Sequence, residues 1–144
     1  MVDLLRHLLG VVFGVMLTVI TWSALGWSTT RIHTEYAQYF GLKPTGTLFL
    51  ALLLIAIVAV GLGLAAAARF MSPIAALIPG VIFFVLGLAE LLLPAQTQFL
   101  SDIDPMGGGT ATFSLSAQGI YPLLGLMLIV SAIPPHRWRA ASAR

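Results

Sequence analysis

The 144-residue sequence contains no cysteine, and only 8% of its residues are charged. The lack of cysteine excludes disulfides, thiolate catalysis and cysteine-ligated zinc or iron–sulfur sites. A soluble domain carries about 25% charged residues, because its surface must face water. This chain has too few charges to cover a globule, so we expect most of its surface to face lipid.

Basic residues are few and scattered. The formal net charge is +2, and Lys43 is the only lysine beside six arginines. Nucleic acid is therefore not an expected partner, because a nucleic-acid groove needs clustered basic residues. The preference for arginine, with much alanine and leucine, is typical of a bacterial genome rich in G and C. We expect a multi-pass protein of the bacterial plasma membrane.

Long apolar runs are abundant, at 59% hydrophobic residues overall. A bilayer core needs about 20 helical residues to be crossed once, and in lipid the backbone must satisfy its hydrogen bonds within the segment. The predicted fold is an all-α membrane protein, a four-transmembrane-helix bundle of two antiparallel hairpins forming one domain, 1–144. The predicted segments are transmembrane helices at about 8–27, 47–69, 73–93 and 115–133, outer loops at 28–46 and 94–114, and a basic cytoplasmic tail at 134–144.

The distribution of basic residues predicts the orientation. Five arginines fall on the side that holds both termini, whereas Arg31 and Lys43 fall on the other. The positive-inside bias therefore places the N- and C-termini in the cytoplasm. The residues expected to anchor the protein at the two interfaces are Trp22, Trp27, Arg137, Trp138 and Arg139.

The N-terminal apolar run has a second interpretation, a cleaved secretory signal. We favour retention as a membrane helix, because Trp22 and Trp27 occupy the region where small residues precede a cleavage site.

Two patterns predict local structure in the outer loops. Apolar residues recur at helical spacing over 32–40, which predicts a short amphipathic helix on the outer membrane surface. Apolar and polar residues alternate over 111–115, which is consistent with a short extended stretch. Asp102 and Asp104 lack the pattern of a calcium loop, so we interpret them as solvated.

Glu90 is the only charged residue inside an apolar run. It shares a helix face with Gly87, Phe83 and Gly80, so we expect it to point into the bundle, roughly 5 Å inside the helix end. The favoured interpretation is a polar tie to the outer loops through Arg31 or Lys43. The alternative is a proton, cation or ligand site, because acids inside membranes are functional candidates by default.

Small residues at spacings of three and four predict where helices pack closely. The positions are Gly10, Gly14, Gly63, Gly80 and Gly87. We favour packing within one subunit over a dedicated dimer interface. Pro79 and Pro122 are candidate kink sites.

The sequence offers no catalytic constellation, nucleotide-binding motif or metal-ligand cluster, so we expect no enzyme activity, cofactor or metal. The favoured function is a non-enzymatic accessory or scaffold subunit, acting through outer loops and small-residue helix faces. Its expected partners are the lipid bilayer and another membrane protein or a second copy of itself. The alternative is an oligomeric small transporter or channel that uses Glu90.

A four-helix pattern with one membrane acid resembles the small multidrug-resistance transporters in architecture. In that family the acid lies in the first helix, whereas Glu90 lies in the third and near its end. The resemblance therefore implies no shared function.

Overall fold

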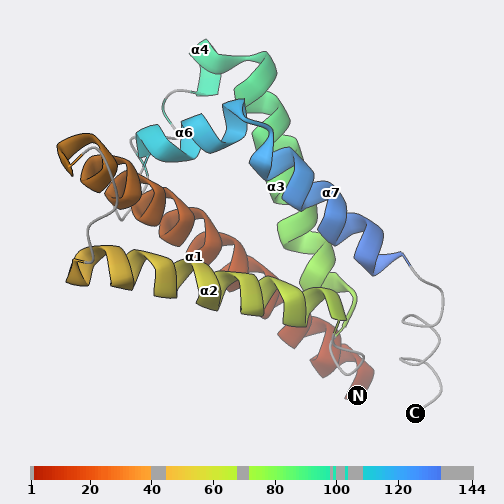
Figure 1. Ribbon diagram of the computed structural model, residues 1–144. Coiled ribbons are helices and arrows are strands. Elements are labelled where there is room, and N and C mark those ends of the chain that lie inside the picture. Colours follow the sequence, from red (N-terminus) through yellow and green to blue (C-terminus); the bar gives the residue numbers. More distant parts are fainter. Residues whose placement is uncertain are drawn as a thin grey trace.

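The computed structural model describes residues 2–39, 45–67, 72–97, 99, 103 and 109–133 (Figure 1). Within these residues all regular structure is helical, which confirms the all-α prediction. The helices are α1 Val2–Tyr39, α2 Gly46–Ala67, α3 Ile74–Leu92, α4 Pro94–Thr97, α6 Gly109–Ala117 and α7 Ile120–Ala132.

Three of these helices, α1, α2 and α3, are long and apolar enough to cross a membrane. The pair α6 and α7 makes a fourth candidate if the two are taken as one bent span. Large apolar side chains on α1, α2, α3 and α7 are exposed, including Phe49 at 70% and Val60 at 62%. The chain is thus a helical membrane protein with three or four candidate spans.

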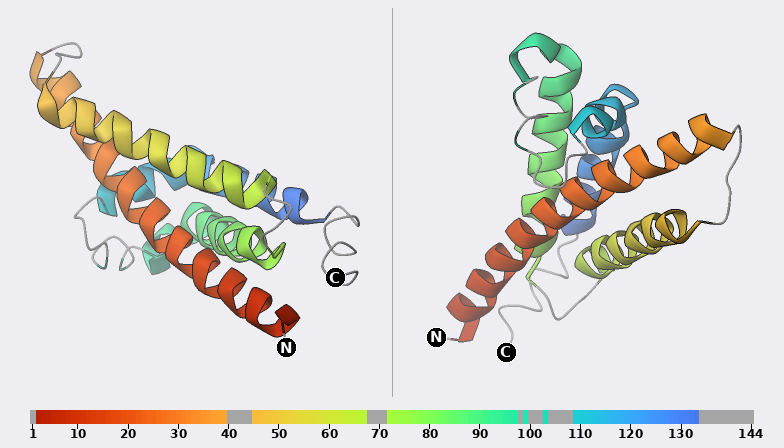
Figure 2. Two further views of the ribbon diagram at one scale, coloured as in Figure 1. Left: turned by 90° about the horizontal axis from the view of Figure 1, so that it is seen from below. Right: turned by 90° about the vertical axis from the view of Figure 1, so that its left-hand side faces the viewer.

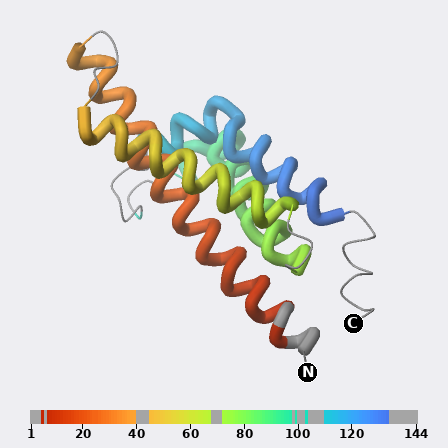
Figure 3. The backbone as a smooth tube through the Cα atoms, turned by 60° about the horizontal axis from the view of Figure 1, so that its bottom comes forward, coloured from red at the N-terminus to blue at the C-terminus, as the bar shows by residue number. Residues whose placement is uncertain are grey.

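The helices are arranged as two antiparallel pairs. α2 packs mainly on α1 and α3 packs mainly on α7, whereas α2 and α3 touch little. Figures 1 and 2 show the two pairs crossing at a steep angle, with α6 between them. Figure 3 shows the start of α1, the end of α2, the start of α3 and the end of α7 toward one end of the molecule.

The first helix is longer than predicted. α1 runs without a break through Ser28 to Tyr39, so 28–39 is an extension of the first span and not a separate helix after a loop. No glycine or proline interrupts 28–39, and threonines there donate to helix carbonyls one turn back. Thr30 Oγ1 lies 2.9 Å from the Gly26 oxygen, and Thr34 Oγ1 lies 2.8 Å from the Thr30 oxygen.

The segment predicted as the fourth span, 115–133, is divided between two helices, because α6 ends at Ala117 and α7 begins at Ile120. α6 and α7 meet at a bend of 68°. Gly119 has φ 76°, a left-handed conformation that glycine adopts without a Cβ clash. Pro122 falls in the first turn of α7, where its missing N–H costs little, so the break lies before the proline.

The extended stretch suggested for 111–115 is wrong, since these residues lie in α6. Hydroxyl residues stand at every second position from Thr110 to Ser116, which is the spacing expected for one face of a strand. In a helix the same spacing places Thr110 with Ser114, and Thr112 with Ser116, on two different faces.

Glycines line the interface between α3 and α7. A Cβ built on Gly125 would lie 2.4 Å from the Phe84 nitrogen, and one on Gly87 would lie 2.5 Å from Pro122 Cδ. At Gly80 the nearest atom would be the Ile129 nitrogen, at 3.0 Å. The two backbones can approach this closely only because these residues lack side chains.

Gly10 and Gly14 perform the same role where α1 meets the start of α3. A Cβ on Gly10 would lie 2.8 Å from Ser72 Cβ, and one on Gly14 would lie 3.2 Å from the Ala75 oxygen. Pro79 has no N–H for that Ala75 carbonyl in the helix ladder. The proline inside α3 and the glycine of the neighbouring helix therefore meet at one place.

Gly63 behaves differently from the other predicted packing glycines. A Cβ built there meets no atom within 4 Å among the described residues. The buried face of α2 consists of Leu48, Ala51, Val58, Leu62 and Ala65. Gly63, together with exposed Ala59 and Ala67, lies on the opposite, outward face.

Candidate functional site

Glu90 lies in the interior near the end of α3. Only 4% of its surface is exposed, and it shares the buried face of the helix with Gly80, Phe83 and Gly87. The helical spacing in the sequence predicted this inward direction.

A polar group from α6 lies beside Glu90. The Ser116 side chain approaches the carboxyl group, but neither Glu90 Oε2 nor Ser116 Oγ makes a hydrogen bond of acceptable geometry within the described residues. Thr112 lies one turn earlier than Ser116 on the same face of α6, and both are almost fully buried. We call Glu90, Thr112 and Ser116 the buried polar centre.

Arg31, one of the two basic partners expected for Glu90, does not pair with its carboxyl group. The Arg31 guanidinium carbon lies 5.4 Å from the centroid of the Trp27 ring, a cation–π contact on the exposed part of α1. Among the described residues no ion pair joins Arg31 to Glu90, and Lys43 lies outside those residues. The predicted polar tie is therefore not formed by Arg31.

A different acid ties α1 to α2. Glu35 Oε1 accepts hydrogen bonds from Thr45 Oγ1 at 3.1 Å and Thr47 Oγ1 at 2.9 Å. Thr45 Oγ1 in turn accepts the backbone N–H of Leu48 at 3.2 Å and so caps the start of α2. This contact was not predicted, because 28–46 was assigned to a loop, although the S/T-rich start of an apolar run is a recognised cap signal.

One predicted interfacial anchor belongs to the interior packing. The ring of Trp22 stacks on Tyr121 of α7, with centroids 5.0 Å apart, and Tyr121 stacks on Phe83 of α3 at 5.5 Å. The Tyr121 hydroxyl donates to the Trp22 carbonyl at 3.5 Å. Trp22 therefore joins α1 to α7. The anchors predicted for the inner interface, Arg137, Trp138 and Arg139, lie outside the described residues.

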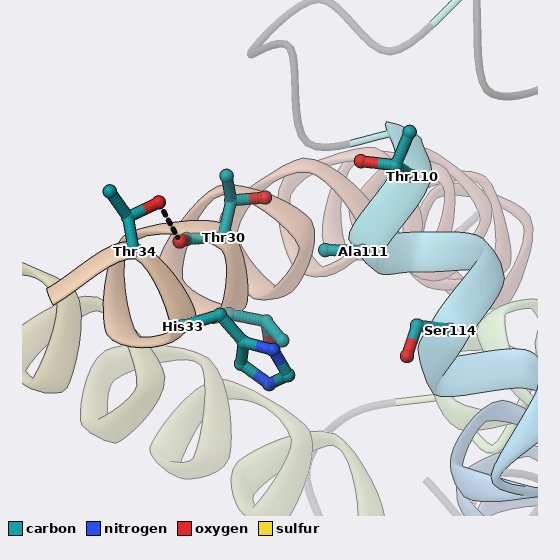
Figure 4. Close-up of a pocket in the computed structure, with 7 residues that line it drawn as sticks. Thr30, His33, Thr34, Thr110, Ala111 and Ser114 are labelled. Carbon is teal, nitrogen blue, oxygen red and sulfur yellow. Dashed lines mark hydrogen bonds between the residues drawn. The ribbon is translucent and has the colours of Figure 1, made fainter. Parts of the chain in front are cut away.

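A separate hydroxyl-lined cleft lies between α1 and α6, with a volume of about 210 Å³. In Figure 4 the His33 ring and the Ser114 hydroxyl face the space between these two helices. The lining residues are Thr29, Thr30, His33, Thr34, Thr110, Ala111 and Ser114.

In comparisons with protein-family models, curated proteins and solved structures, nothing matches this chain. The chemistry of the site must therefore be argued from its own residues.

The buried polar centre contains one acid and two hydroxyls. Within the described residues no group of three metal-ligating side chains is present. A single carboxylate supplies too little charge for a divalent cation, which prefers several oxygen ligands. A proton or a monovalent cation matches the one negative charge.

Proposed function

We propose that this protein is a small non-enzymatic membrane protein of the bacterial plasma membrane that binds a proton or a monovalent cation at Glu90. The observation that carries the proposal is the burial of a carboxyl group whose Oε2 has no partner within the described residues. An isolated buried carboxylate is too costly to keep in a medium of low polarity. A proton or a cation bound to Glu90 removes that cost.

The Arg31 guanidinium contacts the Trp27 ring and not Glu90, and this supports a binding role for Glu90 over the predicted polar tie to Arg31. Glu90 lies two residues before the end of α3, next to the short helix α4. We propose that the four helical segments cross the membrane with both termini in the cytoplasm, so that Glu90 lies near the outer surface. A group at that depth is within reach of external ions and would be filled from the outer side.

Flux through proteoliposomes tests this function. The wild type should pass protons or a monovalent cation, Glu90→Gln should reduce flux to the level of empty liposomes, and Glu90→Asp should retain part of it. Glu35→Gln is the matched control, since it removes an equal charge outside the buried polar centre. An inactive wild type, or an unchanged Glu90→Gln variant, rejects the proposal.

A second measurement covers the case in which Glu90→Gln does not fold. A hydrophobic carbodiimide should label the wild-type protein at Glu90, and sodium or potassium should slow the labelling where choline does not. Labelling that no cation affects would leave only a proton as the ligand, and no labelling at all would contradict a reactive buried carboxyl.

The accessory or scaffold role is the second candidate. The outward small-residue face of α2, with Ala59, Gly63 and Ala67 exposed, supports it, because such faces allow close helix approach in lipid. Affinity capture from native membranes should recover a stoichiometric partner with the wild type and lose it with Gly63→Phe. Recovery of the chain alone in both cases removes this role.

A further inference from the structure

The cleft between α1 and α6 carries several hydroxyl groups, although apolar atoms make up more of its exposed lining than polar atoms do. Its described lining residues contribute threonine hydroxyls, a serine hydroxyl and one imidazole, and no carboxylate, lysine or arginine is among these described residues. An ion would find no complementary charge there except through His33. A neutral ligand rich in hydroxyl groups matches such walls.

Hydrogen bonds already made by the lining residues determine what the walls offer. Thr30 and Thr34 donate their hydroxyl protons to carbonyls of α1, so their oxygens are left as acceptors. Ser114 Oγ lies 3.1 Å from the Gln118 amide nitrogen and accepts its proton, so the Ser114 proton is available as a donor. The cleft thus presents acceptors from α1 and a donor from α6, which is the pattern that sugar or glycerol hydroxyls satisfy.

A second hollow shares His33 with the cleft and is more apolar than the cleft. It has a volume of about 400 Å³, is lined by Ile32, His33, Tyr36 and Ala37, and exposes almost only apolar atoms. His33 lines both hollows. A cleft with hydroxyl groups beside an apolar hollow suits an amphiphile, with its headgroup in the cleft and its chain against the apolar residues of α1.

The aromatic residues around this site indicate its depth. Trp27, Tyr36 and Tyr39 lie on the same part of α1, and Trp and Tyr are enriched at the headgroup level of a membrane. We therefore expect the cleft to lie at the depth of the lipid headgroups.

We propose that the cleft binds the headgroup of a neutral glycolipid, with its apolar chain lying against Ile32, Tyr36 and Ala37. The lipid class is chosen by charge and by hydrogen bonding. A phosphate headgroup would need a lysine or arginine in the lining, and a headgroup without hydroxyls would leave the donor of Ser114 and the acceptors of Thr30 and Thr34 unused. This site is separate from Glu90 and does not depend on the function proposed for it.

Lipid titration with native mass spectrometry of the detergent-solubilised chain tests the site. The probes are monoglucosyl-diacylglycerol, phosphatidylglycerol, diacylglycerol and free glucose. The glucosyl lipid should bind most tightly, and Ala111→Leu, which adds bulk to the cleft wall, should weaken it by about tenfold, or about 1.4 kcal/mol. Ala56→Leu adds the same bulk at another exposed position of α2 and should leave binding unchanged.

Thr30→Val provides a second variant that preserves side-chain shape and removes an acceptor, and it should also weaken the glucosyl lipid selectively. The thermal unfolding midpoint of each variant shows whether it is folded. Equal binding of all three lipids, tighter binding of phosphatidylglycerol, or binding that neither cleft variant changes would overturn the proposal. If free glucose bound as tightly as the lipid, the apolar hollow would contribute nothing to binding, and the proposed contact of the lipid chain with Ile32, Tyr36 and Ala37 would be wrong.

Discussion

Two neighbouring turns of α3 face two very different environments. At Gly87 the helix meets Pro122 of α7, and a Cβ there would lie 2.5 Å from the proline ring. Three residues later Glu90 faces Ser116 of α6, where buried oxygen atoms of both side chains lack partners within the described residues. The first contact is close and apolar, whereas the second is polar and includes buried oxygens that make no hydrogen bond to any described residue.

The difference separates what holds this fold together from what it can do. In lipid, packing of small residues supplies much of the helix association, because lipid chains compete for apolar contacts. Buried polar groups without partners lower stability and are uncommon in native proteins unless water, an ion or a function accounts for them. The glycine interface therefore stabilises the fold that keeps Glu90 buried.

Disrupting the close approach of α3 and α7 should have the largest effect on stability. Gly125→Ala places a Cβ 2.4 Å from the Phe84 backbone nitrogen, so the two helices must separate. We expect the free energy of unfolding to fall by about 2–3 kcal/mol, measured by thermal unfolding in detergent micelles.

Gly63→Ala is the matched control, because its Cβ meets no atom within 4 Å. Its stability should be unchanged or higher by about 0.5–1 kcal/mol, since alanine favours the helix more than glycine does. Equal losses at both positions would mean that helix propensity or an oligomer contact, and not the α3–α7 approach, decides the effect.

Replacing Glu90 should change stability in the opposite direction. Glu90→Leu removes a buried oxygen without a described partner, so we expect the free energy of unfolding to rise by about 1–2 kcal/mol while flux is lost. A loss of stability as large as that of Gly125→Ala would show that Glu90 has a stabilising partner and would contradict its assignment as a binding group.

The sequence predicted the features that depend on local chemistry. Hydropathy located α2 and α3 within a few residues, and helical periodicity placed Glu90 on the buried face. The spacing of Gly80 and Gly87 also indicated where α3 meets a neighbour closely. These features follow from side-chain size, polarity and the helix period, all of which can be read along one segment.

Features that depend on two segments were not predicted. Gly63 has the same local spacing as the packing glycines, but α1 lies on the other face of α2. The contact of Glu90 with Ser116 depends on the bend at Gly119, and a glycine in an apolar run does not reveal a left-handed φ. Trp22 was read as an interfacial anchor because its partner, Tyr121, lies 99 positions away in the sequence.

The smallest effect on stability is expected at Thr45, whose hydrogen bonds to Glu35 and Leu48 are formed. Thr45 caps α2 through the Leu48 N–H and also donates to Glu35 Oε1. Thr45→Ala should therefore lower the free energy of unfolding by about 1 kcal/mol, the usual cost of losing such a cap, whereas Thr45→Ser should retain most of it.

The sign of this effect matters more than its size. Removing the polar group of Thr45 destabilises because its partners, the Leu48 N–H and the Glu35 carboxylate, lose bonds that they make in the native state. Removing the carboxyl group of Glu90 should raise the free energy of unfolding, because no described group makes a hydrogen bond to its Oε2. If thermal unfolding showed the same sign for Thr45→Ala and Glu90→Leu, the distinction between a structural acid contact at α1–α2 and a ligand-binding acid on α3 would fail.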